Sequence, residues 1–154
     1  MKIEMMFIPL VMLLFACQST STLKPEPVAA IEAVQKTSIF YYYVNPVRPA
    51  QSAAVVEGTF LWKEGCLYLV GKDGVYNTAM FPLYPKDIVK WDEATKTLNL
   101  DGHIFNMGNS ISTNGQYSDY VLKSAMGIEY EQQGDKKCLM PTLVMVGTMS
   151  LEKR

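Results

Sequence analysis

From residue 55 onward, short apolar runs alternate with turn signals, and this alternation constrains the fold more than any other feature of the sequence. Such runs, rich in β-branched and aromatic residues and bounded by Gly, Pro, Asn or Asp, are typical of strands. A close series of them is typical of a small barrel or sandwich. We therefore expect strands at residues 55–62, 66–70, 75–81, 88–91, 97–100, 103–107, 111–113 and 143–151.

Glycine marks most of the turns between these runs. Lys63-Glu64-Gly65 and Lys72-Asp73-Gly74 each predict a hairpin turn, and Asp101-Gly102 is the strongest hairpin signal in the chain. The pair Asn114-Gly115 predicts a further turn after the strand at 111–113. The turns thus divide the chain into consecutive antiparallel strands.

One later segment, residues 118–126, has the pattern of a helix. Asp119 lies at its start, a face containing Val121 and Met126 is apolar, and Gly127 is a stop signal. The polar tract 129–137 is expected to be a loop. Strands, one short helix and a closing strand predict a mainly β domain, a small barrel or sandwich of the OB-like kind.

The run Ile-Phe-Tyr-Tyr-Tyr-Val at 39–44 is a further strand candidate, ended by Asn45-Pro46. As a strand it would cover the core. As an exposed patch, its Tyr41, Tyr42 and Tyr43 would dock on a partner or at lipid headgroups, because tyrosine is amphipathic. Both interpretations remain open at this point.

The N-terminus has the pattern of an export signal. Lys2 precedes an apolar run at residues 5–15, which is shorter than the roughly 20 residues that a membrane-spanning helix needs. The following Leu14-Phe15-Ala16-Cys17 resembles the lipobox of bacterial lipoproteins. The alternative is an ordinary secretory signal followed by a chance cysteine.

That resemblance implies cleavage before Cys17, lipid on its sulfur and attachment to a membrane. Gln18 at the next position implies sorting to the outer membrane, facing the periplasm, if the source is Gram-negative. We therefore expect a signal peptide at 1–16, a lipidated N-terminus and flexible tether at 17–38, and a single β-rich domain at 39–154. The Ser, Thr, Pro and Ala of residues 18–30 suit a tether.

Lipidation of Cys17 would leave two cysteines, Cys66 and Cys138. In an oxidising periplasm these two are expected to form a disulfide. Buried free thiols are the alternative. A metal site is less well supported than either, since two cysteines and one distant histidine do not complete a zinc site.

The part of the chain after residue 55 also resembles a group of small uncharacterised secreted bacterial domains. The similarity lies in the order of short motifs: Glu57-Gly58-Thr59, Gly65-Cys66-Leu67, Phe81-Pro82, Leu100-Asp101-Gly102, Met107-Gly108-Asn109 and a late Cys138. It implies an all-β fold with a disulfide. The group carries no assigned activity, so it implies no function.

The sequence contains no recognisable catalytic motif. The single histidine, His103, could form a Ser-His-Asp triad with Asp101 and Ser110. The sequence does not support such a triad, because no G-x-S-x-G elbow is present. Phosphate-binding, zincin and calcium-loop motifs are also absent. We therefore expect no enzymatic activity, no metal and no cofactor.

Charge and aromatic content limit the partners. With 14 Lys+Arg and 15 Asp+Glu the formal net charge is −1, which provides no basic surface for nucleic acid. Trp62 and Trp91, together with Tyr41, Tyr42 and Tyr43, are candidates for a contact surface, with core packing as the alternative.

These observations predict a lipid-anchored envelope lipoprotein that acts as a non-catalytic binding or scaffolding module. Its partners would be the membrane, through the lipid, and an envelope protein or glycan. Two alternatives are an envelope hydrolase with a cryptic site and a small-ligand carrier that uses the barrel interior.

Overall fold

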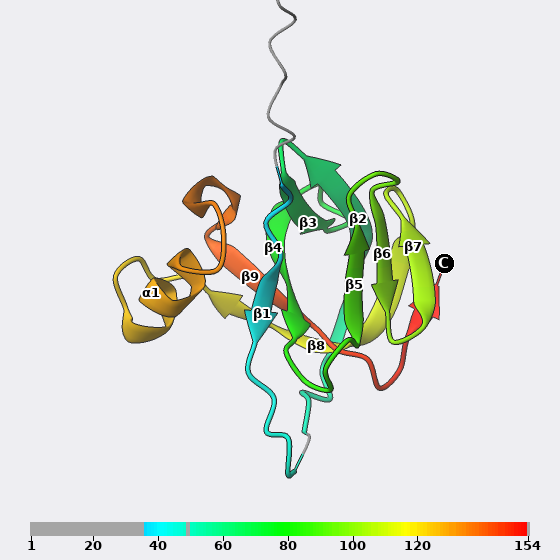
Figure 1. Cartoon of the computed structure of the whole chain (residues 1–154), viewed down its shortest axis with the longest axis horizontal. Coiled ribbons are helices and arrows are strands. Elements are labelled where there is room, and N and C mark those ends of the chain that lie inside the picture. The colour runs from blue at the N-terminus through cyan, green and yellow to red at the C-terminus, as the bar shows by residue number, and fades with distance from the viewer. Residues whose placement is uncertain (1–35, 49, 154) are drawn as a thin grey trace, which may run out of the picture. The chain divides into compact units, whose positions relative to one another are not determined.

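The computed structural model describes residues 36–48 and 50–153, so the expected signal peptide, Cys17 and nearly all of the expected tether lie outside the described residues. Strands dominate the described part of the chain (Figure 1). Its elements are β1 (Phe40–Tyr42), β2 (Val55–Lys63), β3 (Cys66–Val70), β4 (Tyr76–Pro82), β5 (Val89–Asp92), β6 (Thr97–Leu100), β7 (His103–Asn106), β8 (Ser110–Asp119), α1 (Ala125–Glu131), the 3-10 helix η1 (Lys136–Cys138), β9 (Thr142–Val146) and β10 (Glu152–Lys153).

Five of the strands close into a barrel. Their hydrogen-bonded order is β4–β3–β2–β8–β9, and β9 returns to pair with β4. All these pairs are antiparallel except β4 with β9, which is parallel. The closed five-stranded barrel confirms the predicted mainly β, OB-like class.

The barrel closes because β8 changes partners along its length. Residues 110–114 pair with β2, ending at Asn114 opposite Val55, and residues 115–119 pair with β9, beginning at Gly115 opposite Val146. A Cβ atom at Gly115 would collide with the carbonyl oxygen of Met145, so this crossing needs a glycine. The predicted turn at Asn114-Gly115 is therefore wrong, and β8 is much longer than the expected strand at 111–113.

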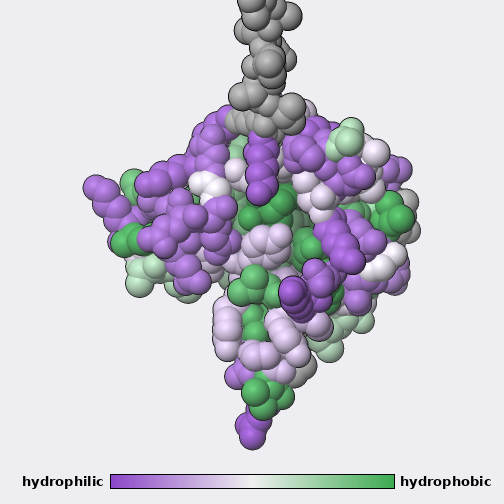
Figure 2. Space-filling model, in the orientation of Figure 1, coloured by the Kyte–Doolittle hydropathy of each residue, from purple (hydrophilic) through white to green (hydrophobic). Residues whose placement is uncertain are grey.

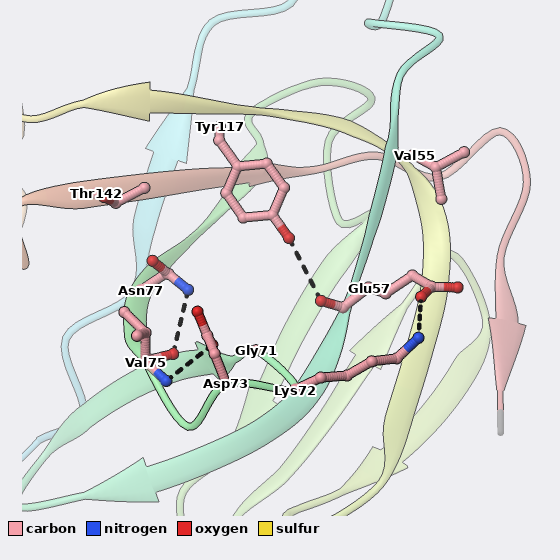
Figure 3. Close-up of a pocket in the computed structure, with 9 residues that line it drawn as sticks. All are labelled: Val55, Glu57, Gly71, Lys72, Asp73, Val75, Asn77, Tyr117 and Thr142. Carbon is pink, nitrogen blue, oxygen red and sulfur yellow. Dashed lines mark hydrogen bonds and ion pairs between the residues drawn. The ribbon is translucent and has the colours of Figure 1, made fainter.

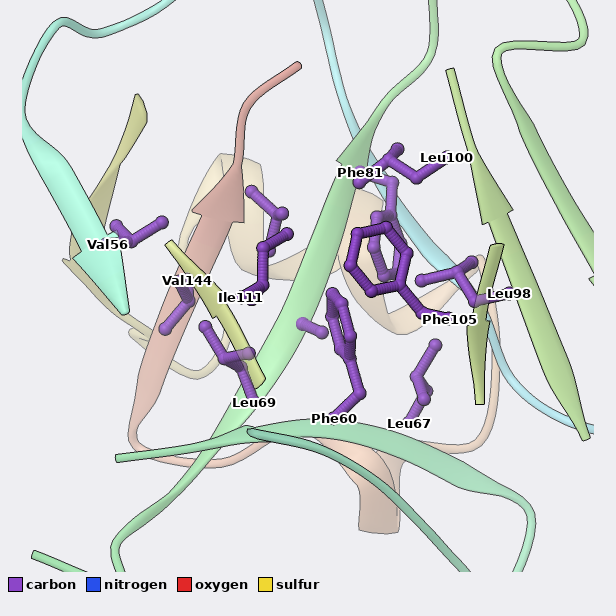
Figure 4. Packing of buried hydrophobic residues seen from close by; sticks show 12 residues of the cluster. Val56, Phe60, Leu67, Leu69, Phe81, Leu98, Leu100, Phe105, Ile111 and Val144 are labelled. Carbon is purple, nitrogen blue, oxygen red and sulfur yellow. The ribbon is translucent and has the colours of Figure 1, made fainter. Parts of the chain in front are cut away.

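Inward-facing side chains fill the barrel (Figure 4). The ring of Phe60 contacts that of Phe105 edge-to-face, with 5.3 Å between their centroids. Phe105 belongs to the three-stranded sheet β5–β6–β7, which packs against the barrel and contributes to the same core. The buried members of this core are Val56, Phe60, Leu67, Leu69, Ala79, Phe81, Leu98, Leu100, Phe105, Ile111, Val144 and Val146.

A second apolar layer covers the outer face of β3, β4 and β9. Strand β1 pairs in parallel with β4, and its Phe40 and Tyr42 are buried, as is Val44 just after it. The interpretation of the 39–44 run as a strand that covers the core is therefore confirmed, with the strand itself at 40–42. The side-chain amide of Gln133 accepts from the backbone N–H of Tyr41 and donates to its carbonyl, and it thereby caps the outer edge of β1.

The expected helix at 118–126 is wrong in position. Residues 118 and 119 continue β8, and α1 begins after Ser124, whose hydroxyl oxygen accepts from the backbone N–H of Gly127. Gly127, expected as a stop signal, lies inside α1. This position needs a glycine, because a Cβ atom there would collide with the carbonyl oxygen of Val121. The expected strand at 143–151 is too long: β9 ends at Val146, and the next strand, β10, begins only at Glu152.

The disulfide between Cys66 and Cys138 attaches η1 to the start of β3 across 72 residues of sequence. We expect the Cys66→Ala/Cys138→Ala protein to lose about 2–5 kcal/mol of unfolding free energy, because the unfolded chain is no longer constrained. Urea denaturation measures this loss. Cys17→Ala leaves the bridge intact and is the control, and an unchanged midpoint for the double variant would contradict the expectation.

Candidate functional site

A groove of about 740 Å³ lies at the mouth of the barrel, near the start of β4, and Figure 3 shows the residues that line it. Strands β2, β4, β8 and β9 and the loop between β3 and β4 all contribute to it. Barrel mouths are among the common positions of ligand sites. The residues that line it are Val55, Glu57, Gly71, Lys72, Asp73, Val75, Asn77, Tyr117 and Thr142.

The alternation of the strands explains why polar groups gather here. On β4, Ala79 faces the core, and Asn77 is the next position on the same face. Thr142 precedes the inward Val144 by two residues on β9, and Tyr117 lies opposite Val144 on β8. The inward face thus changes from apolar to polar at the mouth, where the core ends.

Hydrogen bonds hold two of these side chains in place. The amide of Asn77, whose side chain is buried, donates to the carbonyl oxygens of Leu69 and Val75 at 3.3 and 3.2 Å. Its own carbonyl oxygen therefore remains for a ligand. The hydroxyl of Tyr117 donates to the backbone oxygen of Glu57 at 3.4 Å, while half of the tyrosine stays exposed.

Charged groups form the rim of the groove. The ammonium of Lys72 lies 2.8 Å from the Glu57 carboxylate, which also accepts from the hydroxyl of Ser112. The Asp73 carboxylate accepts from the backbone N–H of Val75 at 3.0 Å. Because the Lys72 side chain is 83% exposed, its ion pair adds little stability and can rearrange around a ligand.

The tyrosines predicted as contact residues fall into different environments. Tyr42 lies in the second apolar layer, where its hydroxyl donates to the carbonyl oxygen of Val146 and burial raises its pKa to about 12. Tyr41 is half-buried against the barrel core. Tyr43 alone is largely exposed, at 72%. Figure 2 shows that hydrophilic residues cover much of the visible face, with apolar patches between them.

Trp62 and Trp91 take part in one hydrogen-bond network rather than an open surface. The indole N–H of Trp91 donates to the Glu93 carboxylate at 2.6 Å, and that of Trp62 donates to the hydroxyl of Thr37 at 2.8 Å. Thr37 and Lys96 also donate to Glu93. The network therefore attaches Thr37, a residue assigned to the tether, to the barrel.

The residues considered for catalysis are not linked to one another through their side chains. His103 is exposed and contacts the backbone oxygen of Asp101, not its carboxylate, while the Ser110 hydroxyl bonds to that of Thr59. Among residues 36–48 and 50–153, no group of three or more His, Cys, Asp or Glu side chains could hold a metal ion. No helix within the described segments is long and apolar enough to cross a membrane.

The residues of the groove were not recognised as a site from the sequence. Tyr117 and Thr142 were assigned to no strand. Glu57 was noted only as part of the strand at 55–62 and of the Glu57-Gly58-Thr59 motif. If residues 111–117 had been taken as one uninterrupted strand, the alternation of its side chains between two faces would have placed Tyr117 on the core face with Ile111. The turn that we expected at Asn114-Gly115 ended the strand at residue 113, so this pattern was not recognised.

Comparison with protein-family models, with curated proteins and with solved structures gives no match.

The Glu93 network predicts a pH dependence of stability. Burial raises the pKa of Glu93, but hydrogen bonds from Lys96, Thr37 and Trp91 outweigh it and hold the pKa at about 2. A lowered pKa in the folded state stabilises the fold above the ordinary value of 4.5, and this contribution disappears as the pH falls from there toward 2.

We therefore expect Glu93→Gln to lower the unfolding free energy by about 1 kcal/mol at pH 7, and the difference from the wild type to shrink between pH 4.5 and 2. Chemical denaturation across this range measures both effects. Glu129→Gln, an exposed change on α1, is the matched control. A difference that stays constant down to pH 2 would contradict this role of Glu93.

Proposed function

We propose that this protein is a lipid-anchored lipoprotein of the bacterial envelope, facing the periplasm, whose barrel is a non-catalytic module that binds a glycan at its mouth. The observation that carries the proposal is the groove in which a half-exposed tyrosine ring lies among fixed polar side chains. The lipid, on Cys17, would hold the module at the outer membrane in a Gram-negative source.

The groove has the two features that a sugar ring requires. A sugar presents an apolar C–H face and a rim of hydroxyl groups. Tyr117 offers a ring for the face, while the Asn77 carbonyl oxygen and the Asp73 carboxylate accept hydrogen bonds from hydroxyls. Lys72 supplies a donor.

The open groove also suits a chain of sugars better than a small enclosed ligand. The barrel interior behind it is filled by Phe60, Phe81 and the other core side chains. A small-ligand carrier needs that interior to be empty. Binding at the mouth requires no rearrangement of the core.

The envelope location rests on the sequence and on one structural feature that agrees with it. The apolar run at 5–15 and Leu14-Phe15-Ala16-Cys17 support export and lipidation. The disulfide between Cys66 and Cys138 supports an oxidising compartment, where such bonds persist. These three features are independent of the groove, so the anchor and the glycan site can be tested separately.

Glycan binding is tested by titrating the purified protein with tetramers of N-acetylglucosamine and of glucose in a calorimeter. We expect Tyr117→Ala to weaken binding about tenfold, because loss of a stacking ring costs about 1.4 kcal/mol. Tyr117→Phe keeps the ring and should retain most of the affinity. Tyr43→Ala removes an exposed tyrosine that does not line the groove and is the control. Equal losses in both alanine variants, or binding to neither tetramer, would contradict the glycan proposal.

The anchor is tested by an intact mass of the protein extracted from the membrane fraction. We expect the mass of residues 17–154 plus acyl chains, with two cysteines that are alkylated only after reduction. An uncleaved chain, or a cleaved chain without lipid and with free thiols, would overturn the envelope assignment. A Cys17→Ser protein, which cannot be lipidated on sulfur, is the control.

A further inference from the structure

A second pocket lies beside the disulfide, on the outer face of the β3–β4 hairpin, and the proposed glycan site does not use it. Its volume is about 310 Å³. It is formed where η1 lies against the β2–β3 turn, with the disulfide joining the two sides and Met140 following η1 into the lining. The lining residues are Lys63, Glu64, Cys66, Tyr68, Tyr76, Lys137 and Met140.

The lining is aromatic and sulfur-rich on its inner side. Tyr68 and Tyr76 pack edge-to-face, with 5.4 Å between ring centroids and 78° between planes. Tyr68 is 8% exposed and Tyr76 is half-buried, so the second ring is the more accessible one. Met140 and the disulfide add polarisable sulfur, which packs favourably against aromatic rings.

Two lysines line this pocket. Lys63 Nζ lies 6.0 Å from the centre of the Tyr76 ring. Lys137 Nζ lies 3.5 Å from the Asp135 carboxylate, a longer ion pair than the 2.6–2.8 Å of the other pairs in the described residues. Both side chains of that pair are nearly half exposed. The two lysines are therefore available to an incoming anion.

Other groups at the pocket limit the kind of anion. Burial raises the pKa of the Tyr68 hydroxyl, and the charges of Glu64 and Asp135 raise it further, so this group remains a hydrogen-bond donor at neutral pH. The same two carboxylates balance the charges of Lys63 and Lys137. A ligand with one negative charge is accommodated, whereas a dianion meets repulsion.

We propose that this pocket binds a small aromatic carboxylate, with its ring against Tyr76 and Met140 and its carboxylate held by Lys63 and Lys137. A free aromatic acid and the C-terminal aromatic residue of a peptide share this chemistry. The site does not depend on the proposed function, because Tyr76 faces outward on β4 while the adjacent Asn77 faces the barrel mouth.

The experiment is an NMR titration of the whole purified protein with two matched pairs of probes. Benzoate is compared with benzamide, and N-acetyl-L-phenylalanine with its C-terminal amide. We expect each acid to bind at least about tenfold more tightly than its amide, because the amide cannot form charge-assisted hydrogen bonds to lysine. The tighter of the two acids identifies a free acid or a peptide terminus as the source.

The variant Lys63→Met/Lys137→Met should remove the preference for the acids. Lys72→Met, a change of an exposed lysine at the barrel mouth, should keep it. Equal affinity for acid and amide in the wild type would overturn the proposal. This comparison uses the wild-type protein alone, so it does not depend on whether a variant folds. Loss of the preference in Lys72→Met, or displacement of benzoate by an equal concentration of inorganic phosphate at neutral pH, would also overturn it.

Discussion

The structure depends on the passage of β8 from β2 to β9 at Asn114 and Gly115. At this point one strand leaves the first half of the barrel and joins the second, and the absence of a side chain at Gly115 lets β9 approach. The neighbouring Asn114 side chain donates to Gln51 and Ser52 and accepts from the backbone N–H of Met149. The crossing is thus tied to the segments before β2 and after β9. The polar mouth follows from it, since Tyr117 reaches the groove only because β8 continues beyond the crossing.

A second consequence concerns the outer face of the barrel. In OB-like barrels the face of the second and third strands commonly binds oligonucleotides or oligosaccharides. Here the corresponding strands, β3 and β4, are covered by β1, α1 and η1, and the disulfide holds this cover in place. Much of that face has become a second core. The mouth and the pocket beside the disulfide are two parts of the described barrel that remain open to ligands.

Most of the fold could be predicted from the sequence wherever glycine turns were unambiguous. Strands β2 to β7 lie close to their expected positions, because turns such as Glu64-Gly65 and Asp101-Gly102 adopt left-handed backbone in the structure. The prediction failed at Asn114-Gly115, where the same dipeptide type serves a strand crossing rather than a turn. Local sequence cannot distinguish the two, since the approach of Met145 comes from 30 residues away. The disulfide was predictable because few cysteines were available, whereas the groove was not, since its residues come from four strands and one loop.

The two tryptophans show why residue type alone did not identify a surface. Each is only half-buried, yet its indole N–H is committed to a network centred on Glu93 and Thr37. Lys96 completes this network by pairing with Glu93 and by lying 4.5 Å from the centre of a Trp62 ring. Because Thr37 precedes β1, the network and the pairing of β1 with β4 together fasten the beginning of the domain to the barrel. Any pull transmitted along the chain from its N-terminal side would therefore act first on the Glu93 network and on β1, before it reaches the rest of the barrel.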